Sequence, residues 1–167
     1  KNKILEKKAY IDLHTGLPNK SKCEELLHNV EFIQDSIACI MFDLNNLKKA
    51  NDTMGHSVGD QLILNFSRIL RNVIPAKDFV GRYGGDEFMV VLYGKSRSQA
   101  EQIMEDLQEE IEHFNQCGNN FPISYAYGCA FSSDYTECTL RTLLDNADSQ
   151  MYYNKRKGKL GNNQACT

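Results

Sequence analysis

Two short apolar runs separated by four residues constrain this chain more than any other feature of its sequence. Residues 79–83 and 88–93 are rich in apolar and aromatic side chains, and Gly-Gly-Asp-Glu lies between them at 84–87. Glycine adopts the backbone conformations that a tight turn needs, so this pattern predicts a β-hairpin. A third apolar run, at 37–42, is typical of a central strand that is buried on both faces. The chain is therefore expected to build an antiparallel sheet around one buried strand.

Four further segments repeat apolar residues at helical spacing, which predicts four helices that each face a core. Their apolar residues are Cys23, Leu26, Leu27, Val30 and Ile33; Val58, Leu62, Phe66, Ile69, Leu70 and Val73; Ala100, Ile103, Leu107, Ile111 and Phe114; and Leu140, Leu143, Leu144, Ala147 and Met151. Alternation at Phe121, Ile123, Tyr125 and Tyr127 predicts one more, half-exposed strand. The order helix, strand, helix, hairpin, helix, strand, helix favours an α+β fold with a central, largely antiparallel sheet flanked by helices.

Composition narrows the classes of protein that fit. The 167 residues have the size of one domain, so we expect a single domain over 1–167, with 1–9 as the end of an upstream linker helix. A net charge of −3 provides no general attraction to nucleic acid. No apolar run approaches the roughly 20 residues that cross a bilayer, so no membrane contact is expected. The six cysteines contain no C-x-x-C pair and no His/Cys ligand spacing, and a reducing, cytoplasmic setting fits best.

The first candidate for chemistry is Asp43, which directly follows the buried run at 37–42. A carboxylate at the exposed end of a strand suits Mg²⁺, which prefers hard oxygen ligands and shares its coordination shell with substrate phosphates. The alternative is that Asp43 caps a helix that begins near Asn46. Both interpretations remain open at this position.

Asp86 and Glu87 lie at the predicted hairpin turn and form the second candidate. They could be solvated turn residues, but the two glycines before them also leave room for a large anionic ligand near the backbone. If the hairpin pairs beside the strand that ends at Asp43, three carboxylates meet at one edge, and their repulsion favours a bound cation. Two metal ions there could activate a hydroxyl and stabilise a transferring phosphoryl group.

The polar segment 51–60 is the third candidate, and Gly55 and Gly59 are expected to interrupt any helix within it. It could be a plain helix–loop–helix connection with Asp60 near a helix start. It could also be a base pocket, because a carboxylate accepts hydrogen bonds from N1–H and the amine of guanine, and adenine offers no matching donors. Near the C-terminus, Lys155 and Lys159 either offset a helix dipole or bind a triphosphate.

Together these segments resemble the GGDEF family of diguanylate cyclases. Residues 84–88 reproduce the family's name motif letter for letter, and residues 12–19 resemble its opening wide turn. Residues 43–60 match its pattern D-x-x-x-x-K-x-x-N-D-x-x-G-H-x-x-G-D, and residues 155–158 match its closing Lys-x-x-Gly. The four motifs occur in the family's order and extend the resemblance over nearly the whole chain.

The resemblance implies an enzyme that condenses two GTP into cyclic di-GMP across a homodimer, with a palm-like, nucleotidyl-cyclase fold and an upstream sensor domain. It implies Mg²⁺ or Mn²⁺ as cofactor, held by Asp43, the backbone carbonyl of Leu44, and Glu87. Asp86 would deprotonate the 3′-hydroxyl and also touch the metal. The implied substrate-binding residues are Asn51, His56 and Asp60 for guanine and Lys48, Lys155 and Lys159 for the triphosphate.

The sequence departs from the family pattern at several positions. Asn45 stands where many members have a second Asp, and Lys159 replaces a common Arg, which removes a bidentate phosphate contact. Pro75 occupies the Arg position of the family's inhibitory Arg-x-x-Asp and leaves only Asp78. The competing hypothesis is an inactive GGDEF domain that binds GTP or cyclic di-GMP and signals by contact. Such modules usually have a damaged acidic motif, whereas the acidic motif here is complete.

Overall fold

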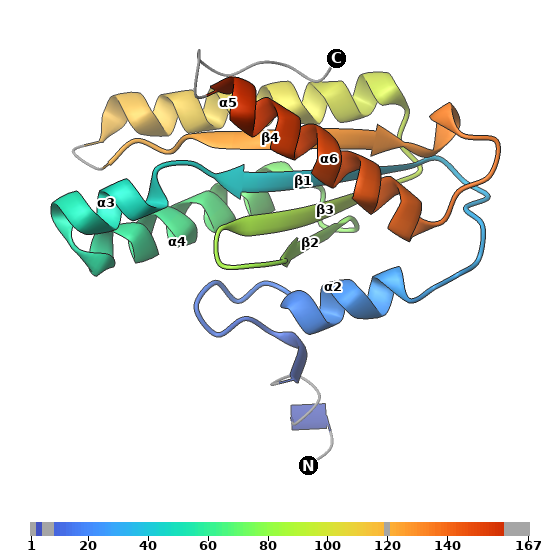
Figure 1. Ribbon diagram of the computed structural model, residues 1–167, viewed down its shortest axis with the longest axis horizontal. Helices are drawn as coiled ribbons and strands as arrows, with labels where there is room; N and C mark the ends of the chain where they lie inside the picture. The colour runs from blue at the N-terminus through green and yellow to red at the C-terminus, as the bar shows by residue number, and fades with distance from the viewer. Residues whose placement is uncertain (1–2, 5–8, 119–120, 159–167) are drawn as a thin grey trace.

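The chain forms one antiparallel sheet with helices on both faces (Figure 1). The computed structural model describes residues 3–4, 9–118 and 121–158. The elements are α2 (Lys20–Leu27), β1 (Ile37–Leu44), α3 (Leu47–Met54), α4 (His56–Val73), β2 (Phe79–Arg82), β3 (Glu87–Tyr93), α5 (Arg97–Cys117), β4 (Tyr125–Phe131), a 3₁₀ turn (Ser132–Asp134) and α6 (Leu140–Gly158). This order confirms the predicted α+β fold, with α3 and the 3₁₀ turn added.

The sheet has the strand order β2-β3-β1-β4, and every neighbouring pair is antiparallel. The predicted hairpin is present as β2 and β3, joined by a turn in which the amides of Tyr83 and Gly84 both donate to the carbonyl of Glu87. β3 then pairs with β1 in a register that places Glu87 opposite Asp43. The sequence motif at the hairpin turn therefore lies beside the end of the central strand.

β1 is buried on both faces, as its continuous apolar sequence predicts. Ile40 and Phe42 point into a core closed by α4 and α5. Cys39 and Met41 point the other way, into a core closed by α2 and α6. In Figure 1, α6 accordingly crosses the front of the sheet while α4 and α5 lie behind it. No helix among the described residues has the length and apolarity needed to cross a bilayer.

Two predicted boundaries are wrong. The first helix ends at Leu27 and does not continue to Ile33; Val30 is 83% exposed, and the amide of Ile33 donates to the carbonyl of Cys138. The last strand begins at Tyr125, not at Phe121, because its partner β1 ends at Leu44, opposite Tyr125. Just before it, the backbone of Ile123 bonds to the side chain of Asn115 instead of to a strand.

The two glycines of the segment 51–60 behave differently from one another. Gly55 separates α3 from α4 and has a φ of +96°, a conformation that favours glycine. Gly59 was also expected to break a helix, but it lies buried inside α4. It faces α3 so closely that a Cβ added there would lie 2.0 Å from Oδ1 of Asn51. Gly59 thus permits close packing between the two helices.

Gly128 performs a similar role between β4 and α6. A Cβ added to Gly128 would lie 2.1 Å from the carbonyl oxygen of Ala147 and 2.5 Å from the amide nitrogen of Met151. These are backbone atoms of a helix, so no side-chain rotation could relieve the clash. The absence of a side chain at Gly128 therefore fixes the distance between α6 and the sheet.

We predict that Gly128→Ala lowers the free energy of unfolding by about 3 kcal/mol, because α6 must move away from β4 and lose packing. Urea denaturation followed by circular dichroism measures this change. Gly158→Ala is the control, since a Cβ at Gly158 meets nothing within 4 Å. Equal stability of the two variants would contradict the proposed close approach.

Candidate active site

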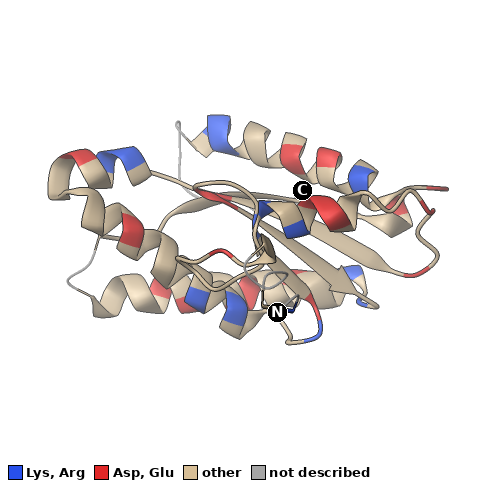
Figure 2. Cartoon of the chain, turned by 90° about the horizontal axis from the view of Figure 1, so that it is seen from below, with Lys and Arg blue, Asp and Glu red and all other residues tan. Residues whose placement is uncertain are grey.

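Charged residues are almost absent from the sheet, and those that occur gather at one end of it. The four strands contain three of them: Asp43 in β1, Arg82 in β2 and Glu87 in β3. Figure 2 shows the strands almost entirely in tan, with basic and acidic residues interspersed on the helices. Carboxylates are rarely placed at the end of a buried strand without a partner. This end of the sheet is therefore the candidate site.

Asp43 is the most buried of these carboxylates, with 14% of its side chain exposed. Its Oδ2 accepts a hydrogen bond of 2.8 Å from Nζ of Lys155, whereas its Oδ1 is buried and has no partner. Burial raises the pKa of Asp43, and the neighbouring Asp86 raises it further, against the opposing effect of Lys155. The helix-cap hypothesis for Asp43 is wrong, because Asn46, with a φ of +62°, is the N-cap residue of α3.

Glu87 and Asp86 are held close to Asp43 by the sheet itself. Glu87 is the register partner of Asp43, and the carbonyl of Asp86 accepts a 2.9 Å bond from the amide of Leu44. The Glu87 side chain lies over Gly84, where an added Cβ would be 3.3 Å from its Oε1. Burial raises the pKa of Glu87, and the negative charges of Asp43, Asp148 and Asp86 raise it further.

These acids share an edge, but they do not form a closed metal cage. No three His, Cys, Asp or Glu side chains of the described residues are arranged so that they could hold a metal ion. The donor set nevertheless fits Mg²⁺ or Mn²⁺, because Asp43 Oδ1 is an unpartnered buried acceptor and the clustered charges repel each other. Mg²⁺ commonly takes only one or two carboxylates and fills its shell with waters and phosphates.

Sequence analysis missed Asp148, which α6 brings to the same place. Asp148 lines a pocket of about 470 Å³ together with Asp43, Glu87, Ser149, Met151 and Tyr152. Burial raises its pKa, and Asp145 adds to this effect. A signal was present in the sequence, because Asp148, Met151 and Lys155 follow each other at the spacing of one helix face.

Lys155 reaches the carboxylates from the last turn of α6, where Arg156 and Lys157 follow it. We expected Lys155 to bind phosphate, and it lies at the right end of the sheet to do so. In this structure its ammonium group instead neutralises Asp43. Lys159, the other phosphate ligand predicted near the C-terminus, lies outside the described residues.

The predicted base-reading residues form a second group, on α3 and α4. The Asn51 side chain lies against Gly59, and the Oδ1 atom of Asn51 is buried without a partner. Asp60, which follows Gly59 in α4, is exposed. His56 is exposed at the first position of α4, and Lys48 is exposed in the first turn of α3. The structure therefore places the Asn51 side chain against the residue that precedes Asp60, on different elements from the carboxylates.

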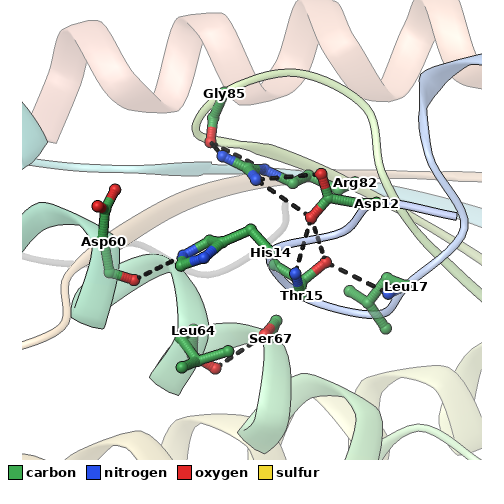
Figure 3. Close-up of polar contacts among 9 residues, drawn as sticks. All are labelled: Asp12, His14, Thr15, Leu17, Asp60, Leu64, Ser67, Arg82 and Gly85. Carbon is green, nitrogen blue, oxygen red and sulfur yellow. Dashed lines mark hydrogen bonds and ion pairs between the residues drawn. The ribbon is translucent and has the colours of Figure 1, made fainter.

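The turn that precedes α2 contacts the hairpin (Figure 3). Asp12 accepts hydrogen bonds from the amide and hydroxyl of Thr15 and from the guanidinium of Arg82. Burial raises the pKa of Asp12, but these hydrogen bonds outweigh it, so the pKa lies below its ordinary value. Arg82 also donates twice to the carbonyl of Gly85, at 3.2 and 2.7 Å. Arg82 is therefore occupied within the protein and supports the hairpin turn.

Asn45 and Asp78, which the comparison with the family pattern singled out, both have partners within the protein. Asn45, which stands where an Asp is common, donates from its amide group to the hydroxyl of Ser124. Asp78, expected as the remnant of an inhibitory site, is 4% exposed; it forms an ion pair with Lys95 and accepts from the amide of Tyr93. Its carboxylate serves to fasten the end of β3.

We predict that Glu87→Gln stabilises the ligand-free protein at pH 7. A carboxyl pKa that is raised in the folded state gives stability at pH values below the unfolded pKa of about 4.3, and this stability is lost as the pH rises through the folded pKa. Removing the charge should raise Tm by roughly 1–2 °C at pH 7, allowing for solvent screening, and change nothing below about pH 4. Thermal unfolding at both pH values tests this; a lower Tm at pH 7 would refute it.

Comparison with known proteins identifies the family of this chain. The sequence profile described as "Diguanylate cyclase, GGDEF domain" matches residues 9–160. Diguanylate cyclase DgcS of Shewanella oneidensis is 32% identical over 155 residues, which cover 90% of this chain and 51% of that protein. The chain thus spans about half the length of this relative.

Solved structures show the same fold. A sensory box/GGDEF family protein from Caulobacter crescentus is 29% identical, with a TM-score of 0.70 over 89% of this chain and 99% of that one. The GGDEF domain of DgcB from Caulobacter crescentus, solved in complex with c-di-GMP, has a TM-score of 0.75 at 24% identity, over 90% of this chain and 92% of that one. The chain belongs to the GGDEF domain family of diguanylate cyclases.

Proposed function

We propose that this domain is an active diguanylate cyclase that joins two GTP into cyclic di-GMP and releases two pyrophosphates. The observation that carries the proposal is the pairing of Asp43 with Glu87 across β1 and β3, with Asp86 beside them and Lys155 above Asp43. The acids provide a hard-oxygen site, and the lysine is a cation suited to phosphate. The identity with DgcS supports the same conclusion.

Asp43, Glu87 and the carbonyl of Leu44 are the groups that would hold Mg²⁺ or Mn²⁺, with Asp86 adjoining them. When bound, the metal supplies charge stabilisation for the phosphates and lowers the pKa of the attacking hydroxyl. It would also relieve the repulsion that raises the pKa values of Asp43 and Glu87. The unpartnered Oδ1 of Asp43 would thereby gain a partner.

The chain's own residues would perform the proton transfer and the orientation of the substrate. Asp86 accepts the proton of the 3′-hydroxyl, whose oxygen then attacks the α-phosphorus of the second GTP. A new P–O bond forms, the bond to the β-phosphate oxygen breaks, and pyrophosphate leaves; a second, equivalent step closes the ring. Lys48, Lys155 and Lys159 hold the triphosphate, and Lys155 exchanges its contact with Asp43 for phosphate oxygens.

Guanine recognition falls to the group on α3 and α4. The exposed carboxylate of Asp60 accepts from N1–H and the amine of guanine, and Asn51 and His56 line the same place. Since Asn51 Oδ1 is buried and unpartnered, a guanine donor would satisfy it. ATP would leave these acceptors unpaired, which costs about 1–3 kcal/mol for each group.

We further propose that two copies of the domain meet to react, because each supplies one such site and the product contains two guanylate units. A sensor region elsewhere in a longer, cytoplasmic or membrane-anchored protein would control this meeting. Nucleic acid is not a proposed partner, because the charges on the described helices are mixed in sign (Figure 2).

The deciding experiment is incubation of the protein with GTP and Mg²⁺ or Mn²⁺, followed by identification of the product by mass spectrometry. Cyclic di-GMP is expected, with a specific activity that rises with protein concentration. Glu87→Gln should lower turnover at least ~100-fold, as expected when electrostatic stabilisation is removed. Glu105→Gln, on the exposed side of α5, is the control and should retain full activity. Binding of GTP without turnover would assign the domain to the inactive, signalling class.

We predict that Gly59→Ala separates stability from substrate binding. The new Cβ would displace the Asn51 side chain, while alanine favours a helix over glycine by up to about 1 kcal/mol. Stability should therefore be unchanged or higher, and the KM for GTP should rise about 10-fold, as expected for one lost buried hydrogen bond.

The control for this prediction is Asn51→Ala, alone and combined with Gly59→Ala. If both substitutions act on the same contact, the double variant should have the same KM as Asn51→Ala. Additive increases in KM would mean that Gly59 does not act through Asn51.

A further inference from the structure

The turn before α2 makes a second contact, which the proposed chemistry does not use. Nε2 of His14 lies 3.0 Å from the backbone carbonyl of Asp60. A carbonyl can only accept, so the imidazole must donate. The two residues are 46 positions apart in sequence, and Figure 3 shows the ring of His14 reaching from the turn to α4. The carboxylate of Asp60 points away from this contact in the same view.

This bond adds a directional polar contact to the apolar packing at the start of α4, where Val58 packs against the core and Leu62 and Ile63 are buried in it. Of residues 56–61, Gly59 is the buried one, and it faces α3. His14, which lies outside α3 and α4, donates a hydrogen bond from its side chain to this stretch. The helix pair that carries Asn51 and Asp60 is thus held by the packing of Ala50, Leu62 and Ile63 in the core and, at the start of α4, by one polar contact with the turn.

The same turn also holds the catalytic hairpin. Asp12, two residues before His14, binds Arg82, and Arg82 donates to the carbonyl of Gly85, directly before Asp86 (Figure 3). The base end of the proposed site, at Asn51 and Asp60, and the phosphate end, at the hairpin turn, are therefore linked through one short segment. A nucleoside triphosphate would occupy both ends at once, so its binding depends on the distance between them.

We propose that His14 is a positioning residue that sets the base-reading helices at the correct distance from the catalytic hairpin. This rests on the proposed function, because it concerns how one GTP spans the site. His14 does not touch the nucleotide and does not shape the base pocket itself, whose contacts lie within α3 and α4. Its loss should therefore weaken ligands that span both ends and leave ligands that occupy the base end alone unaffected.

The test compares GTP with guanosine in variants that keep or remove the donor. His14→Leu should raise the Kd of GTP about 2- to 10-fold, the effect of one net hydrogen bond, without changing the Kd of guanosine. Titration calorimetry in the presence of Ca²⁺ measures the Kd of GTP and the Kd of guanosine. His14→Gln keeps an N–H donor and should bind GTP like the unmodified protein. Leu13→Ala is the matched control on the same turn, because Leu13 is 88% exposed.

Hydrogen exchange of ligand-free protein provides a readout that does not depend on nucleotide. Amides of residues 56–62 should exchange faster in His14→Leu than in His14→Gln or Leu13→Ala. If the three variants exchange alike, or if His14→Leu weakens guanosine as much as GTP, the proposal is wrong. If exchange responds as expected while the unmodified protein binds neither GTP nor guanosine, the positioning contact stands and the proposed function fails.

Discussion

The antiparallel pairing of β1 with β3 is the constraint on which the rest of this site depends. It is a backbone register, and it alone decides that Asp43 meets Glu87. A slip of one residue would turn every β1 side chain to the opposite face and exchange its two cores. Because β1 is apolar on both faces, such a slip is resisted by the packing of Phe42 on one side and Met41 on the other. The hydrophobic core therefore fixes the position of the acids.

The clustered acids in turn destabilise the end of the sheet through their mutual repulsion. Asp43 and Glu87 both have raised pKa values, so the folded protein is less stable when they are charged. The ion pair between Lys155 and Asp43 offsets part of this repulsion and connects the end of α6 to the end of β1. Gly128 makes that connection possible, since it lets α6 lie against β4. Stability and site geometry thus depend on the same helix.

Sequence reasoning recovered what periodicity and turn chemistry encode, and missed what depends on contact between distant segments. The hairpin at 84–87, the buried strand and the antiparallel sheet followed from local pattern. The pairing of Lys155 with Asp43 and the place of Asp148 did not, because they require the packing of α6 on the sheet. Gly59 was misinterpreted as a helix break, since a glycine packed inside a helix and a glycine that ends one look alike in sequence.

The segment that precedes α2 affects how the domain should behave in concentrated solution. β2 is an edge strand, and the carbonyl of Pro18 accepts a 2.8 Å bond from the amide of Arg82 on that edge. Cys23 of α2 also lies against Gly81 of the same strand. An uncovered strand edge invites pairing with another molecule and aggregation. The segment from Ile11 to α2 therefore covers the edge of β2. A shortened chain that began after Pro18 would expose an aggregation-prone strand edge.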